Sequence, residues 1–158
     1  GSGKQLGKAG AQWVPQMSGH HLVIQAHEAP SPDDIRRLVD HLVAFNRERV
    51  GASDHRPLAV FIHDAGELVG GACGYTHWKW LFVSHLWLAE PLRGNGWGRR
   101  LMREIEALAA RRGCRAAHLD TFSFQALEFY EKLGYRRFGT LPDYPLGESR
   151  YFLWKKLI

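Results

Sequence analysis

The chain has 158 residues, of which 45% are hydrophobic and 23% charged, as in an ordinary globular domain with one core. Lys and Arg number 21 against 16 Asp and Glu, and the formal charge of +5 favours anionic ligands. The basic residues are scattered among acids, so we expect no nucleic-acid partner. No uncharged stretch approaches the roughly 20 apolar residues that cross a bilayer, so we expect no membrane partner. The two cysteines, Cys73 and Cys114, are too few for a disulfide framework and lack the CxxC spacing of a metal or redox site. We therefore expect both to be small buried side chains of a cytoplasmic protein.

The first 20 residues differ in character from the rest. They are Gly-rich, follow no apolar period and begin with Gly-Ser, as expression tags often do. We therefore predict a flexible, tag-like segment over residues 1–20 and a single domain over residues 21–158.

The domain begins with a strand and a helix. Residues 22–24 form a short β-rich run. In residues 31–34, Ser suits an N-cap, Pro the first helical position and the two Asp the positive helix end. Apolar residues at helical spacing over residues 35–43 mark one face of the predicted helix.

Three strands are predicted next. Residues 58–63 and 68–75 read as a hairpin whose turn is residues 64–67. A third strand, residues 81–88, leads directly into a glycine-rich turn. The next helix shows one apolar face from Leu101 to Ala109, and Gly113 is placed as its left-handed C-cap.

The last third alternates short elements. A strand over residues 117–121 precedes a short helix that Ser123 is predicted to cap and Gly134 to end. Strands over residues 135–139 and 151–157 follow. The order predicts a mixed α/β sheet rather than a doubly wound one.

The glycine-rich turn has the chemistry of an anion site. Gly94, Gly96 and Gly98 lie between a strand and an amphipathic helix, where backbone N–H groups can surround an anion without interference from Cβ atoms. The helix N-terminus adds its positive dipole, and Arg93 and Arg99 bracket the loop. The plainer alternative is a turn that needs glycine only for its own geometry.

Two common phosphate loops are excluded by spacing. A dinucleotide GxGxxG fingerprint would need glycine in place of Arg99 or Leu101. A nucleotide P-loop would need GK[ST] after four intervening residues, and the sequence has no such run.

Two motifs together resemble the GCN5-related N-acetyltransferase (GNAT) superfamily. The pattern [R/Q]xxGx[G/A] runs from Arg93 through Gly96 to Gly98, and residues 86–98 resemble the family's fourth strand, phosphate loop and third helix in order. Residues 123–135 resemble its second motif, NxxAxxFYxxxGF. The resemblance extends from about Ser31 to the C-terminus, with Ser123 in place of the usual Asn and Tyr135 in place of Phe.

The resemblance implies a mostly antiparallel, twisted central sheet flanked by about four helices. It implies acetyl-CoA as co-substrate without a metal, and direct attack on the thioester by a primary amine of a small molecule or peptide. A homodimer is compatible with it. The cofactor-binding residues that it implies are Leu86, Trp87, Leu88, Arg93, Gly94, Asn95, Gly96, Trp97, Gly98, Arg99, Ser123 and Tyr130.

The catalytic assignments follow from the needs of acyl transfer. The leaving thiolate benefits from an acid, and the resemblance implies that the Tyr130 phenol points at the cofactor sulfur. Backbone N–H groups of the strand ending at Leu88 would polarise the carbonyl. For the base that takes the amine proton we predict Glu90, with three alternatives left open: His85, Asp120 and Asp143.

The acceptor is not specified by the sequence. One segment is rich in aromatic residues: Tyr75, Trp78, Trp80, Phe82 and Trp87. These side chains either line a small-molecule pocket or belong to the core. Acids in the loop of residues 142–148 suit a cationic amine such as a polyamine, an aminoglycoside or a lysine side chain. Two other classes stay open: a non-catalytic acyl-CoA sensor or scaffold, and a basic nucleic-acid-binding domain.

Overall fold

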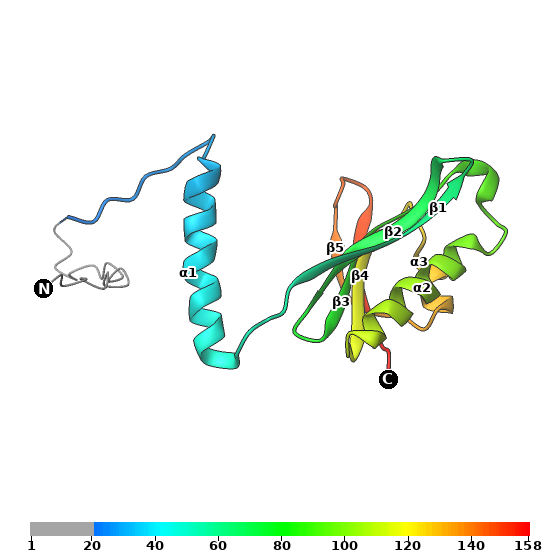
Figure 1. Ribbon diagram of the computed structural model, residues 1–158. Coiled ribbons are helices and arrows are strands. Elements are labelled where there is room, and N and C mark those ends of the chain that lie inside the picture. The colour runs from blue at the N-terminus through cyan, green and yellow to red at the C-terminus, as the bar shows by residue number, and fades with distance from the viewer. Residues whose placement is uncertain (1–20) are drawn as a thin grey trace, which may run out of the picture. The chain divides into compact units, whose positions relative to one another are not determined.

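The computed structural model describes residues 21–158 (Figure 1). The predicted tag-like segment, residues 1–20, lies outside the described residues. Contacts within the chain define two units, Gly1–Leu42 and Val43–Ile158, each of which is described by itself. None of the helices over residues 21–158 is both long enough and apolar enough to span a bilayer.

Helix α1 (Pro32–Val50) begins where the sequence predicts. The Ser31 hydroxyl accepts the Asp33 N–H at 3.2 Å, and the Asp33 carboxylate pairs with Arg36 at 2.8 Å. Gly51 then ends the helix at a φ of 86°. The strand predicted over residues 22–24 is wrong, because a β-rich run becomes a strand only where a neighbouring strand pairs with it, and none of the described strands does.

The second unit is built on one six-stranded sheet. Its strands are β1 (Arg56–Asp64), β2 (Glu67–His77), β3 (Trp80–Leu88), β4 (Ala116–Phe122), β5 (Arg136–Pro142) and β6 (Ser149–Lys156). Their order is β1-β2-β3-β4-β6-β5, and only the β3–β4 pair is parallel. The predicted mixed, mostly antiparallel sheet is confirmed.

Strands β3 and β4 separate soon after they begin to pair. Their parallel register covers only Trp80–Phe82 against Ala116–His118. Beyond Phe82, β3 keeps its β2 neighbour but pairs with no other described strand. The sheet therefore opens between the C-terminal parts of β3 and β4.

A β-bulge lies at the point of separation. Cys73 pairs with His85 and Gly74 with Val83, so Ser84 is the extra residue of β3. A Cβ atom at Gly74 would lie 1.8 Å from the Phe82 carbonyl oxygen. Only glycine fits opposite this bulge.

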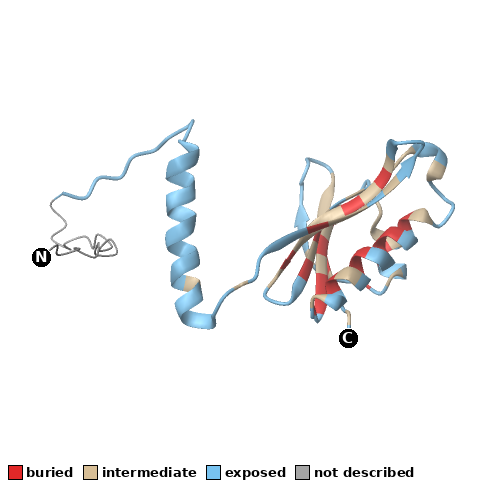
Figure 2. Cartoon of the chain, in the orientation of Figure 1, coloured by how far each residue is buried: buried red, intermediate tan, exposed pale blue. Residues whose placement is uncertain are grey.

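Helices α2 (Trp97–Arg111) and α3 (Leu127–Lys132) lie on the same side of the sheet (Figure 1). The inner face of α2 is buried along with the middle of the sheet (Figure 2). Fully buried side chains from helix and sheet form the core, among them Met102, Ile105, Leu81, Leu153 and Tyr135. The unit thus has a single core between sheet and helices.

The described residues contain three α-helices and the short 3-10 helix η1 (Glu90–Leu92), one α-helix fewer than the four expected. The short segment between α1 and β1 contains no further helix. Gly113 and Gly134 end α2 and α3 at φ values of 84° and 96°, as predicted.

The predicted N-cap of α3 is wrong. Ala126 occupies that position, and no side chain caps the helix. The Ser123 hydroxyl instead donates to the Glu148 carboxylate and accepts the Ser149 N–H at 2.9 Å. A partner from the β5–β6 loop has therefore replaced the local cap.

Candidate active site

The turn between β3 and α2 leaves its backbone open. Gly94 and Gly96 have φ values of 76° and 83°, a left-handed conformation that favours glycine. A Cβ atom at either position would meet nothing within 4 Å. Gly96 is also the N-cap residue of α2, and the Asn95 side chain donates to the Arg93 carbonyl at 3.2 Å within the turn. The first N–H groups of α2 thus begin beside open space, which favours an anion.

Gly98 has a different role from the other two glycines. It is buried in the first turn of α2, and a Cβ atom there would lie 3.2 Å from the Phe129 ring. Its lack of a side chain therefore lets α2 and α3 approach each other.

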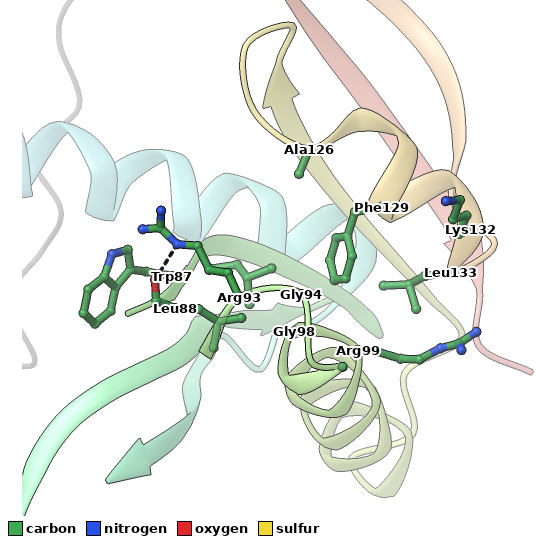
Figure 3. Close-up of a pocket in the computed structure, with 12 residues that line it drawn as sticks. Trp87, Leu88, Arg93, Gly94, Gly98, Arg99, Ala126, Phe129, Lys132 and Leu133 are labelled. Carbon is green, nitrogen blue, oxygen red and sulfur yellow. Dashed lines mark hydrogen bonds between the residues drawn. The ribbon is translucent and has the colours of Figure 1, made fainter. Parts of the chain in front are cut away.

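A cleft of about 580 Å³ opens beside the turn (Figure 3). This volume lies within the range that small ligands and cofactors occupy. Residues of β3, the turn, α2 and α3 line it: Leu86, Trp87, Leu88, Arg93, Gly94, Gly96, Gly98, Arg99, Ala126, Phe129, Lys132 and Leu133.

Three basic side chains line this mostly apolar cleft. Arg93 is fixed by a hydrogen bond from its Nε to the Leu88 carbonyl at 3.0 Å (Figure 3). Arg99 extends from the first turn of α2, and Lys132 from the last turn of α3. The cleft therefore combines positive charge with an apolar wall, which suits a ligand with phosphates and an organic arm.

The backbone of β3 presents two hydrogen-bonding positions to the opening. The Ala89 N–H donates to the Val69 carbonyl at 2.8 Å, so this residue pair is a hydrogen-bonded one. Because such pairs alternate along an antiparallel ladder, Leu88 and Leu86 are the non-hydrogen-bonded positions. Their N–H and C=O groups point away from β2, toward the side from which β4 has separated.

Eight of the 12 predicted cofactor residues line the cleft. The other four do not line it. The Asn95 side chain bonds to the Arg93 carbonyl within the turn, and the Trp97 ring lies 4.4 Å from the Arg100 guanidinium. Ser123 donates a hydrogen bond to Glu148, and Tyr130 lies in the core.

Helix α3 and its two cap residues form a cleft wall that was not predicted from the sequence: Ala126, Phe129, Lys132 and Leu133. Their spacing of three and four residues was a signal, since it places them on one helix face.

Tyr130 is buried beside the rings of Phe129 and Tyr135, at centroid distances of 5.1 and 6.1 Å. Burial, with a smaller effect of the Asp120 carboxylate, raises the pKa of Tyr130 to about 12. The phenol therefore keeps its proton at neutral pH.

The candidate bases occupy different settings. Glu90 is the exposed first residue of η1. Asp120 forms an ion pair with Arg150 at 2.8 Å, and the Asp143 carboxylate accepts the Gly147 N–H at 3.3 Å. The His85 Nδ1 lies 2.9 Å from the Ser84 hydroxyl.

The predicted aromatic cluster lies partly on the sheet surface. Trp78, Trp80 and Trp87 are exposed, while Tyr75 and Phe82 are half-buried. A shallow hollow of about 420 Å³ is lined by Trp80, His118, Phe138 and Trp154. The predicted aromatic cluster therefore contributes to the surface and to this hollow as well as to the interior.

His118 has a shifted pKa. Burial lowers the pKa of His118, and the nearby Asp120 carboxylate partly offsets this effect.

A family model described as the acetyltransferase (GNAT) family matches residues 17–135. The chain belongs to this family. The resemblance seen in the two motifs is therefore confirmed, and this GNAT acetyltransferase has the fold expected of it. Over residues 21–158 we find no group of three or more His, Cys, Asp or Glu side chains that could hold a metal.

Several relatives are acetyltransferases. Blasticidin-S acetyltransferase of Streptomyces morookaense is 40% identical over 114 residues, which cover 69% of this chain and 84% of that protein. An acetyltransferase of Agrobacterium fabrum is 38% identical over 122 residues, covering 77% of this chain and 89% of its own. A crystal structure of an Agrobacterium tumefaciens acetyltransferase superposes with a TM-score of 0.80 at 32% identity, covering 85% of this chain and 99% of that one.

Proposed function

We propose that this protein is an acetyl-CoA-dependent N-acetyltransferase that acetylates a primary amine of a small molecule or peptide. One observation carries the proposal: an anion-binding turn and the outward-facing backbone of Leu86 and Leu88 share one cleft. Acetyltransferases of this family use acetyl-CoA, whose pyrophosphate and pantetheine arm match those two features in order.

Coenzyme A would be held from two sides. The turn and the start of α2 would take the pyrophosphate, with charge from Arg93, Arg99 and Lys132. Pantetheine amides would pair with the backbone of Leu86 and Leu88, as an added strand pairs with a sheet edge. The acetyl group would then lie in the opening between β3 and β4.

Transfer would proceed by direct attack. The amine nitrogen forms a bond to the thioester carbon, and a base accepts the amine proton. A backbone N–H at the opening stabilises the negative oxygen of the tetrahedral intermediate. The C–S bond then breaks, and the Tyr130 phenol gives its proton to the departing thiolate. The base is one of the four candidates that the sequence leaves open: Glu90, His85, Asp120 or Asp143.

The acceptor class is inferred from the acidic side chains and from one relative. Among the acids near the opening, Asp120 is already paired with Arg150, while Asp143 accepts a backbone N–H of its own loop. The name of the Streptomyces morookaense relative indicates a small-molecule acceptor, blasticidin S, for that protein. We propose a cationic small-molecule amine ahead of a peptide.

The test is acetyl transfer from acetyl-CoA to a panel of amines, measured as release of free CoA thiol. The panel contains blasticidin S, aminoglycosides, polyamines and short peptides with free amino termini. Acetylated product detected by mass spectrometry is the expected result. Tight acetyl-CoA binding with no product from any amine would instead support the sensor or scaffold function.

A further inference from the structure

Three side chains capable of proton transfer meet at the β-bulge. The Ser84 hydroxyl donates to the Cys73 carbonyl at 3.1 Å and lies 2.9 Å from the His85 Nδ1. The Cys73 Sγ lies 3.6 Å from the Ser84 hydroxyl and 3.8 Å from the same ring nitrogen. The bulge creates this cluster, because it brings Ser84 and His85 together beside the end of the β3–β4 pairing.

The hydrogen bonds define the state of the His85 ring. A serine hydroxyl has one proton, and the Ser84 proton is used on the Cys73 carbonyl, which can only accept. The contact between Ser84 and His85 therefore needs the ring Nδ1 as donor. In the neutral ring the other nitrogen, Nε2, then carries the free lone pair.

The sheet directs this ring to the face opposite the cofactor cleft. The Leu86 and Leu88 side chains line the cleft on the α2 side. Side chains alternate along a strand, so His85, next to Leu86, projects from the other face. His85 is exposed there. An amine that approaches the opening from that side would approach the face that carries the exposed His85 ring.

The other candidate bases are less well placed. Asp120 and Asp143 are already engaged, by Arg150 and the Gly147 N–H respectively. Glu90 lies in η1, beyond the end of β3. It is therefore further along the chain from Leu86 than His85, which is the neighbour of Leu86.

We propose that His85 is the general base of the acetyl transfer and that Ser84 is its positioning residue. The proposal rests on the proposed function. Nε2 accepts the proton of the attacking amine as the C–N bond forms, while Nδ1 keeps its proton and donates a hydrogen bond to the Ser84 hydroxyl. The thiolate receives a proton from Tyr130. The proton that His85 took passes to solvent, and Tyr130 regains a proton from solvent, which restores both side chains.

The tautomer is tested first, without any substrate. Long-range proton–nitrogen NMR spectra of the ¹⁵N-labelled protein, with His85 assigned through the loss of its signals in His85→Ala, report which ring nitrogen carries the proton. We expect the Nδ1-protonated form in the wild type and a mixture or the opposite form in Ser84→Ala. A predominantly Nε2-protonated ring in the wild type overturns the proposal.

Kinetics test the role of the base. Loss of a general base costs about 100-fold or more, so His85→Ala should lower kcat by about that factor. Its acetyl-CoA dissociation constant should stay within twofold by calorimetry, and added imidazole should restore part of the turnover. His63→Ala, an exposed histidine on β1, is the matched control and should keep wild-type kinetics.

Ser84 is tested through its hydroxyl. Ser84→Ala should lower kcat about tenfold, the equivalent of one ordinary hydrogen bond, and Ser84→Thr should restore it. Full activity of His85→Ala, or activity lost in Glu90→Gln alone, overturns the assignment and leaves the proposed function intact. A wild-type protein that acetylates no amine overturns both.

Discussion

At the scale of single residues, burial sets the protonation state of Tyr130. The surrounding Phe129 and Tyr135 rings exclude water, and the Asp120 carboxylate disfavours a second negative charge. A phenol with a pKa of about 12 carries its proton at every physiological pH. The same burial that stabilises the core therefore keeps the phenol in the protonated form that the proposed transfer to the thiolate needs.

Tyr130→Phe should lower kcat by about 100-fold, because it removes the donor to the leaving thiolate. The acetyl-CoA dissociation constant should change little, since Phe keeps the ring packed against Phe129 and Tyr135 and removes only the hydroxyl. Steady-state kinetics and calorimetry on the same preparation measure both quantities. Unchanged turnover would remove Tyr130 from the mechanism.

His118 makes the stability depend on pH. Burial lowers its pKa, so below about pH 6.5 the unfolded chain binds a proton that the folded chain resists. The free energy of unfolding should therefore fall as the pH drops from 7.5 to 5. His118→Phe keeps a ring against Phe82, 4.9 Å away in the native pair, and should show a smaller fall. Urea titrations at the two pH values give the comparison, and equal falls in both proteins would contradict it.

At the scale of elements, α2 has a glycine in the left-handed conformation at each end, but only one of the two lies beside the cleft. Gly96 begins the helix beside the open cleft, and Gly113 follows its last turn near the Lys79 side chain. Both residues satisfy backbone geometry, but only Gly96 adjoins the predicted phosphates.

Replacement of each glycine by Ala separates strain from binding. Both variants should lose about 1–2 kcal/mol of unfolding free energy, because Ala resists a positive φ. Gly96→Ala should also weaken acetyl-CoA binding at least tenfold by distorting the turn, whereas Gly113→Ala should bind normally. Equal affinities, measured by calorimetry, would mean that the turn does not hold the cofactor.

At the scale of the whole second unit, the cleft depends on segments distant in sequence. Strand β3 and the turn form one wall, while α3, about 30 residues further along, forms the other. Neither wall forms the cleft alone, so ligand binding and folding of the unit are linked.

Acetyl-CoA should therefore raise the midpoint of thermal unfolding. A ligand at 100 times its dissociation constant adds about 2.7 kcal/mol to the unfolding free energy. S-acetylpantetheine, which lacks the phosphates, should stabilise far less at the same concentration. Scanning calorimetry with each ligand makes the comparison, and equal stabilisation would rule out the turn as the main anchor.

Much of the fold was accessible from local patterns. The β1–β2 hairpin, the start of α1 and the glycine ends of α2 and α3 follow from periodicity and from glycine's tolerance of positive φ. Local reasoning failed where a distant or missing partner decided the outcome. Ser123 bonds to Glu148 instead of capping α3, and residues 22–24 pair with no described strand.

The candidate site divides in the same way. The sequence by itself determined the family and predicted an anion-binding turn, because the glycines, Arg93 and Tyr130 lie within two short motifs. Only the tertiary structure decided the early separation of β3 from β4, the α3 wall with Lys132, and the bulge that joins Ser84 to His85. The physical reason is that register and packing depend on residues far apart along the chain, which no local spacing encodes.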